Sequence, residues 1–130
     1  MTRERRPTVS LLIVEASTPT RSHLRRVFGQ DPAFRLSGDA ETGAAGLELF
    51  LQFRPDVVLV GIDLPDQSGF DVLARIRETD PACGVILLSN TLDPFVDYVG
   101  RQLGANDIWP KSGRFAQVRE MALNAVDVKG

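Results

Sequence analysis

The sequence is poor in cysteine, histidine and lysine, and it has no long hydrophobic run. Its one cysteine, Cys83, cannot form a disulfide within the chain, so nothing points to a secreted, disulfide-stabilised protein. The first apolar run, residues 9–14, is too short for a signal-peptide core or a membrane span, and Glu15 ends it. These absences predict a cytoplasmic protein with no membrane partner.

The charge balance excludes a strong electrostatic field around the molecule. Basic residues are nearly all arginine, because lysine occurs only at Lys111 and Lys129, and the formal net charge is −2 at pH 7. We therefore expect no nucleic-acid partner. The 130 residues suit one folded domain, with 43% hydrophobic and 25% charged residues. We expect residues 1–7 to be a disordered tail and residues 8–130 to form the domain.

Short β-type runs alternate with helical patterns along the chain. Residues 9–14 and 57–60 are near-continuous apolar runs, which are typical of strands buried on both faces. Three weaker runs and five helical patterns complete the series, and they predict strands at 34–38, 85–88 and 107–109 and helices at 18–29, 42–53, around 70–76, 93–104 and from about 112. Strands that alternate with helices imply an α/β fold, a doubly wound parallel sheet with helices on both faces.

A doubly wound sheet places its functional site at the carboxyl ends of the strands, where the strand order reverses. Four short segments follow predicted strands at that edge, and they are residues 15–17, 61–63, 89–90 and 111–112. The argument about function therefore concerns these few positions.

Four stretches carry these positions, and they are LLIVE at 11–15, PDVVLVGIDLPDQSG at 55–69, VILLS at 85–89 and GANDIWPK at 104–111. With them the sequence resembles the receiver domain of two-component response regulators. Their order, spacing and strand placement all agree with the family, and the resemblance covers residues 9 to about 127. It implies a CheY-like, flavodoxin-like sheet of strand order 2-1-3-4-5 with five helices. It also implies a part in phosphorelay signal transduction, and no enzyme activity of its own.

The family's phosphorylation pocket is degenerate here. In the family a pair of acids follows the first strand and an aspartate that ends the third strand accepts phosphate, and together they hold Mg²⁺. Carried over by position, Glu15 takes the first acid position, whereas Ala16 takes the second and offers no ligand. Gly61 takes the acceptor position and offers no nucleophile.

The rest of the pocket is partly retained. By the same resemblance Ser89 keeps the hydroxyl and Lys111 keeps the ammonium that contact the phosphoryl group in the family, while Ile108 stands where members often have a switching aromatic residue. An unpaired buried ammonium costs several kcal/mol. We therefore expect Lys111 to pair with Glu15 or Asp63.

Asp63 is the one carboxylate that offers an alternative acceptor. It lies two residues after Gly61, so its side chain faces the same pocket if the strand continues. Two strand residues span about 6.6 Å, however, and in-line phosphoryl transfer tolerates far smaller displacements. Glu15 and Asp63 together make at most a weak residual Mg²⁺ site, so we expect no metal and no cofactor.

These features favour a stand-alone, atypical receiver, a pseudo-receiver that works without phosphorylation by protein–protein interaction. The resemblance implies a partner surface on the fourth helix, fifth strand and fifth helix, for which the candidate contacts are Tyr98, Arg101, Ile108 and Trp109. The expected partner is a histidine kinase, another response regulator or a second copy in a homodimer. One alternative is a functional receiver phosphorylated on a surrogate such as Asp63. Another is a flavodoxin-like cofactor binder, but the hydroxyl-rich loop at 16–20 lacks the expected glycines.

Overall fold

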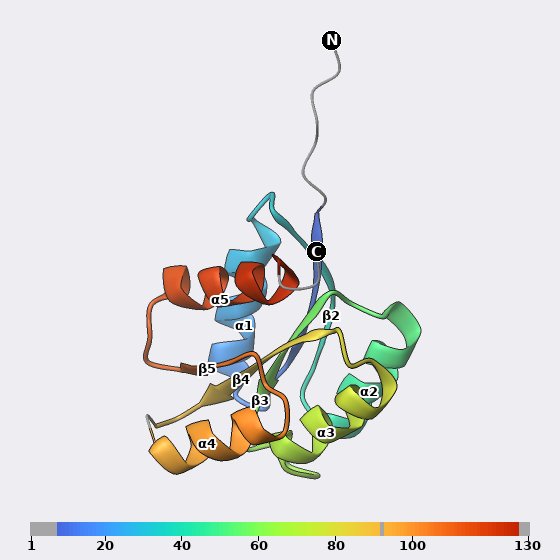
Figure 1. Cartoon of the computed structure of the whole chain (residues 1–130). Helices are drawn as coiled ribbons and strands as arrows, with labels where there is room; N and C mark the ends of the chain where they lie inside the picture. The colour runs from blue at the N-terminus through green and yellow to red at the C-terminus, as the bar shows by residue number, and fades with distance from the viewer. Residues whose placement is uncertain (1–7, 92, 128–130) are drawn as a thin grey trace.

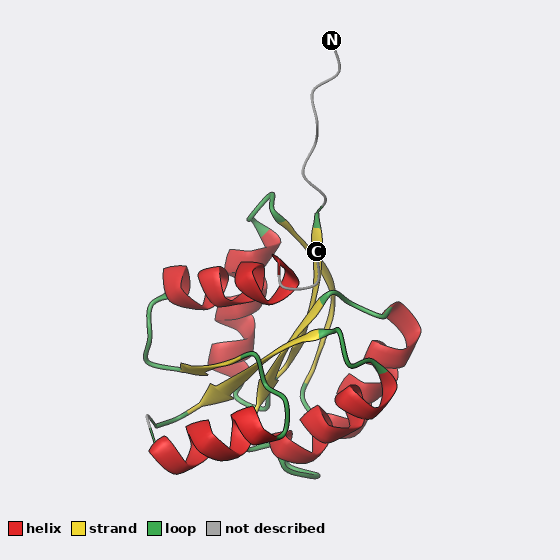
Figure 2. Ribbon diagram, viewed as in Figure 1, coloured by secondary structure: helices red, strands yellow, loops and turns green. Residues whose placement is uncertain are grey.

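The computed structural model describes residues 8–91 and 93–127, so the tail expected at residues 1–7 lies outside the described residues. Within these ranges strands and helices alternate strictly (Figure 2). The strands are β1 (Val9–Val14), β2 (Phe34–Ala40), β3 (Val57–Gly61), β4 (Gly84–Ser89) and β5 (Asp107–Pro110). The helices are α1 (Thr18–Gly29), α2 (Gly43–Phe53), α3 (Gly69–Thr79), α4 (Pro94–Gln102) and α5 (Phe115–Asp127).

The five described strands form one parallel sheet in the order β2-β1-β3-β4-β5. Helices α1 and α5 cover one face of this sheet, and α2, α3 and α4 cover the other (Figure 1). The predicted doubly wound fold and its strand order are confirmed. The order reverses between β1 and β3, which places the switch point where those two strands end.

Alternate residues of the central strands fill two separate cores. On β1, Leu11 and Ile13 pack with α1 and α5, whereas Leu12 and Val14 pack with α2 and α3. All six residues of β1 are buried because both faces of the strand are covered. This double burial explains why the central strands are almost continuously apolar in the sequence.

Local hydrogen bonds set the helix ends, and one end differs from the sequence prediction. Helix α1 begins at Thr18 as predicted and is capped by Ser17, because the extended backbone of Ser17 lets its Oγ accept from the Thr20 N–H at 3.4 Å. Helix α5 begins at Phe115 and not near Ser112, because the preceding residues form a turn closed by the Gly113 N–H and the Pro110 carbonyl at 2.7 Å. In residues 8–91 and 93–127 no helix has the length and apolar character needed to cross a membrane.

Candidate functional site

The sheet register brings the retained pocket residues to one edge. Val14 of β1 pairs with Val60 of β3, so Glu15 and Gly61 follow side by side at the carboxyl ends of these strands. Ser89 ends β4 and Lys111 follows β5, and the Lys111 N–H donates to the Ser89 carbonyl at 2.7 Å. Four positions that are far apart in the sequence therefore meet at the switch point.

A buried ion pair joins Glu15 and Lys111 across this edge. Lys111 Nζ donates to Glu15 Oε2 at 2.8 Å, and the side chains are 13% and 1% exposed. The Ser17 N–H donates to the same oxygen at 2.7 Å. The expected pairing of Lys111 with Glu15 is confirmed. Such a pair is stable only while both partners are present, because each alone leaves an uncompensated charge away from water.

The second oxygen of the Glu15 carboxylate fills the space beside Gly61. Glu15 Oε1 is buried and has no hydrogen-bond partner within the described part of the chain. A Cβ added to Gly61 would lie well inside 3.0 Å of this oxygen, closer than real Cβ atoms approach a neighbour. Gly61 does not have a positive φ. Glycine is thus needed here for the room that Glu15 occupies, and not for an unusual backbone conformation.

Ser89 has its hydroxyl committed to a local turn. Its Oγ donates to the Thr91 carbonyl at 2.7 Å and accepts from the Thr91 N–H at 3.2 Å. Ser89 is only 3% exposed, so burial would make this hydroxyl costly to leave unpaired. The Ser89 hydroxyl therefore stabilises the turn that connects β4 to α4.

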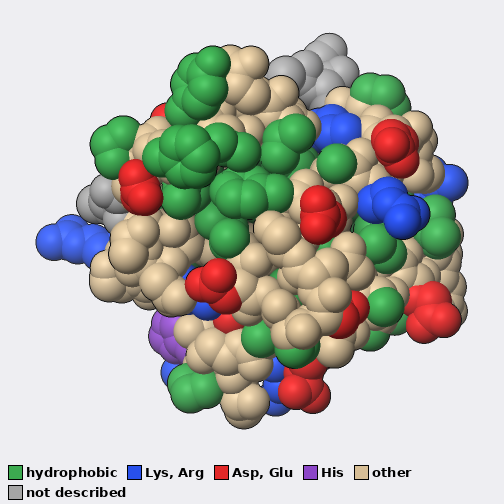
Figure 3. Space-filling model, turned by 90° about the horizontal axis from the view of Figure 1, so that it is seen from below, with side chains coloured by type: hydrophobic (Ala, Val, Ile, Leu, Met, Phe, Trp, Pro, Cys, Tyr) green, Lys and Arg blue, Asp and Glu red, His purple; other side chains and the backbone are tan. Residues whose placement is uncertain are grey.

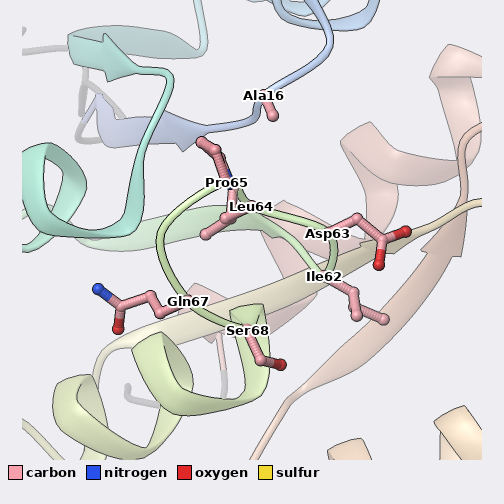
Figure 4. A pocket seen from close by; sticks show the side chains of 7 residues that line it. All are labelled: Ala16, Ile62, Asp63, Leu64, Pro65, Gln67 and Ser68. Carbon is pink, nitrogen blue, oxygen red and sulfur yellow. The ribbon is translucent and has the colours of Figure 1, made fainter.

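Asp63 lies on the surface and has a different partner. Its Oδ2 accepts from Asn90 Nδ2 at 3.2 Å, in an exposed contact between the loops that follow β3 and β4. Asp63 also borders an open hollow of about 460 Å³ beside Ala16. Figure 4 shows that Asp63 and Gln67 project to opposite sides of the loop that carries them. Asp63 was the other partner expected for Lys111, but the Lys111 ammonium binds the Glu15 carboxylate instead.

Asp66 is a structural residue of the site that sequence reasoning missed. Its carboxylate accepts the N–H groups of Gly43 at 2.8 Å and Ala44 at 2.9 Å, so it links the loop after β3 to the first turn of α2. These two backbone hydrogen bonds hold the pKa of Asp66 below its ordinary value of 3.8. The Pro65-Asp66 pair predicts a turn, and only the tertiary structure shows which helix the turn caps.

This cap predicts an acid-sensitive contribution to stability. Because the folded pKa of Asp66 is depressed, its contribution is complete above the ordinary value of 3.8 and is lost as pH falls through the folded value. Asp66→Asn should therefore lower the urea midpoint near neutral pH, and the difference from the parent should shrink in acid. The measurement is the midpoint as a function of pH, with Glu78→Gln on the exposed surface of α3 as the control. A difference that stays constant across pH would contradict this.

The candidate partner residues differ in their exposure. Tyr98 is 63% exposed on α4, and the side chain of Arg101 is 48% exposed while it binds Asp97 and Asp107. Trp109 is only 3% exposed, so the expectation that it contacts a partner is wrong for this structure. Its ring packs in the core with α5, and its Nε1 donates to the Arg114 carbonyl at 3.2 Å. Ile108 lies on β5 and is partly buried next to Gly100 of α4.

The strand order and the residues at the switch point define a CheY-like α/β domain. Residues 11–123 match the model of the response regulator receiver domain, so the chain belongs to this family. It is thus a receiver domain of two-component signalling.

Two curated relatives show the same resemblance in sequence. A protein-glutamate methylesterase/protein-glutamine glutaminase of Symbiobacterium thermophilum is 31% identical over 96% of this chain and 29% of its own length. Protein-glutamate methylesterase/protein-glutamine glutaminase 6 of Anaeromyxobacter dehalogenans is 33% identical over 95% of this chain and 36% of its own. This chain spans about a third of the length of these relatives.

Solved structures agree with the fold. The signal receiver domain of the putative response regulator NarL from Mycobacterium tuberculosis is 25% identical, has a TM-score of 0.81, and is matched over 94% of this chain and 96% of that one. A CheY-like receiver domain protein from Methanospirillum hungatei has a TM-score of 0.86 at 18% identity over 95% and 97% of the two chains. At that identity the second likeness supports the fold alone.

The residues present do not fit the Mg²⁺ ion that the family implies. Ala16 and Gly61 offer no side-chain oxygen, and Glu15 Oε2 already accepts from the Lys111 ammonium. A cation beside that ammonium would meet its positive charge at close range. Across residues 8–91 and 93–127, no three His, Cys, Asp or Glu side chains are placed to hold a metal ion together.

Proposed function

We propose that this chain is an atypical receiver that works without phosphorylation and acts by binding another signalling protein. One observation carries the proposal. The Glu15 carboxylate fills the space next to Gly61 and holds Lys111, so the pocket contains its own counter-charge. We infer that this internal pair replaces the family's acceptor carboxylate as the partner of the lysine and keeps the pocket in one state.

The charges of the pocket oppose phosphoryl transfer. A phosphoryl group needs a nucleophile and a cation to neutralise the charge that develops in the transition state. Gly61 supplies no nucleophile, and recruiting Lys111 would take from Glu15 the ammonium that neutralises it. Breaking a buried pair in this way costs several kcal/mol. The proposed partner is a histidine kinase, another response regulator or a second copy of this chain.

A functional receiver phosphorylated on Asp63 is the alternative. The exposure of Asp63 favours access by a small phosphodonor, but its carboxylate accepts from the neutral Asn90 amide and not from a cation. The methylesterase and glutaminase activities in the names of the curated relatives belong to proteins of which this chain spans about a third. We propose no methylesterase activity for the receiver itself.

Incubation with acetyl phosphate and Mg²⁺, followed by intact-mass measurement, separates the two functions. We expect no phosphoryl adduct, because position 61 has no acceptor and Lys111 is already paired. Asp63→Asn is the matched control. An adduct on the parent chain that disappears in this variant would establish Asp63 as a surrogate acceptor and would overturn the proposal.

A further inference from the structure

Helices α2 and α3 lie side by side on one face of the sheet and share an exposed surface with an apolar centre (Figure 1). Leu51 of α2 is 56% exposed, and Leu47, one turn earlier, is half-buried. A small hollow of about 110 Å³ lies between the two helices here, and it is lined by Leu47, Phe50, Leu51, Arg75, Glu78 and Thr79. The leucine and the apolar floor of the hollow would gain stability from burial against another molecule.

Four exposed charges form the rim of this surface, which we call the α2–α3 patch. Glu48 and Arg54 lie on the α2 side, and Arg75 and Glu78 lie on the α3 side. None of the four forms an ion pair within the described part of the chain. Arg54 instead lies over the Phe50 ring, with its Cζ 5.6 Å from the ring centroid. The rim therefore presents two positive and two negative charges to a partner.

The order of these charges is self-complementary. Both helices connect parallel strands across the same face of the sheet, so they run in the same direction. Glu48 lies three residues before Leu51, and Arg54 lies three residues after it.

A two-fold axis through the hollow, at right angles to both helices, reverses the helix direction in a second copy. Glu48 then faces Arg54 of the second copy. Arg75 and Glu78 both line the hollow from α3, so the same axis brings Arg75 opposite Glu78 of that copy. Each of these contacts occurs twice, and each joins opposite charges.

We propose that the α2–α3 patch binds a second copy of this chain in this antiparallel, two-fold arrangement, with Leu51 packed against its symmetry mate. The inference names one partner of the proposed function and rests on it in that respect. Charge complementarity selects this occupant, because an isologous interface is stable only where the patch matches itself. The apolar centre is small, so the dimer is weak and depends on concentration.

A second apolar surface, on α4, provides the control. Figure 3 shows hydrophobic side chains gathered at the end of the molecule where α4 lies in Figure 1. Phe95 and Tyr98 of α4 are 69% and 63% exposed. This is the surface that the family resemblance implies for other partners, so Tyr98→Ala should leave association through α2 and α3 unchanged.

Sedimentation velocity across about 10–500 µM protein measures the association, and we expect the sedimentation coefficient to rise with concentration toward that of a dimer. Leu51→Arg should weaken the association about tenfold or more, because two like charges then meet at the axis in place of two leucines. A chain that stays monomeric throughout, or association that survives Leu51→Arg, would overturn the inference. Association that Tyr98→Ala abolishes would do the same.

Charge reversal tests the two-fold register. Arg75→Glu alone places like charges opposite each other at both α3 contacts, and so does Glu78→Arg alone. Each variant should therefore associate about two- to tenfold more weakly than the parent. A mixture of the two variants restores opposite charges at both contacts, because each copy supplies the sign that the other lacks, and we expect it to form a heterodimer as readily as the parent forms a homodimer. A mixture that associates as weakly as the separate variants would contradict the register.

Folding and phosphorylation are separated from this result. Urea unfolding at about 1 µM, where mass action favours the monomer, checks that each variant folds. A purely structural role of Arg75 and Glu78 within α3 would change these midpoints, but it would not restore association in the mixture. A phosphoryl adduct with acetyl phosphate would defeat the proposed function and leave the dimer unchanged. A monomeric parent without an adduct would defeat only this inference.

Discussion

Gly61→Asp, the change that restores the family's acceptor residue, should destabilise the protein. Any side chain at position 61 must displace the buried Glu15 carboxylate, because its Cβ would lie well inside 3.0 Å of Oε1. Overfilling a packed site costs about 1–3 kcal/mol, which is the expected loss for Gly61→Ala. Gly61→Asp should lose more, since a second carboxylate beside Glu15 adds like-charge repulsion in a space with one ammonium.

Glu15→Ala should rescue Gly61→Asp. The double variant removes the carboxylate that blocks position 61 and gives Lys111 a new one in its place. We expect it to be more stable than either single variant, with a coupling energy of about 0.5–3 kcal/mol in a double-mutant cycle. Urea unfolding of the four proteins measures this coupling. Additive losses would show that Glu15 and position 61 do not compete for the same space.

Lys111→Met should lower the free energy of unfolding by about 3–5 kcal/mol. Methionine keeps much of the lysine chain's volume but leaves the Glu15 carboxylate buried with the Ser17 N–H as its remaining partner. The loss therefore comes from an uncompensated charge and not from a cavity. Equilibrium urea unfolding, with Arg101→Met on the exposed side of α4 as a control, gives the comparison. The control breaks exposed ion pairs and one exposed hydrogen bond to the Asn106 carbonyl, and exposed ion pairs contribute about 0–1 kcal/mol.

The combination Glu15→Gln with Lys111→Met tests the origin of that loss. A neutral glutamine in the same place carries no charge that needs the ammonium, so the double variant should recover much of the stability lost by Lys111→Met alone. If the double variant loses the sum of both single effects, the pair contributes through packing. The interpretation of an electrostatic lock would then be wrong.

Patterns along the chain were sufficient to predict most of the fold. Near-continuous apolar runs at residues 9–14 and 57–60 identify strands buried on both faces, and this burial is seen in β1 and β3. Turn and cap residues were less informative. Ser17 and Thr18 are both good capping residues, and only the backbone path decides that Ser17 caps α1.

The candidate site could be predicted in part. Its residue types and their positions after the strands are visible in the sequence, because parallel strands carry their following loops to one edge. The burial of Trp109 could not be predicted from the sequence, because a single aromatic residue on an edge strand fits a buried or an exposed position equally well. Packing against α5 decides that it is buried. Asp66 was likewise read as a turn residue, because its partners on α2 lie more than twenty positions away.

The sequence by itself determined that position 61 has no carboxylate and that a glutamate and a lysine follow the strands around it. Only the tertiary structure decided that Lys111 binds Glu15 and that the Glu15 carboxylate stands where a side chain at position 61 would be. The physical reason is that composition and order fix which charges exist, whereas strand register and side-chain packing fix which of them meet and what space is left between them.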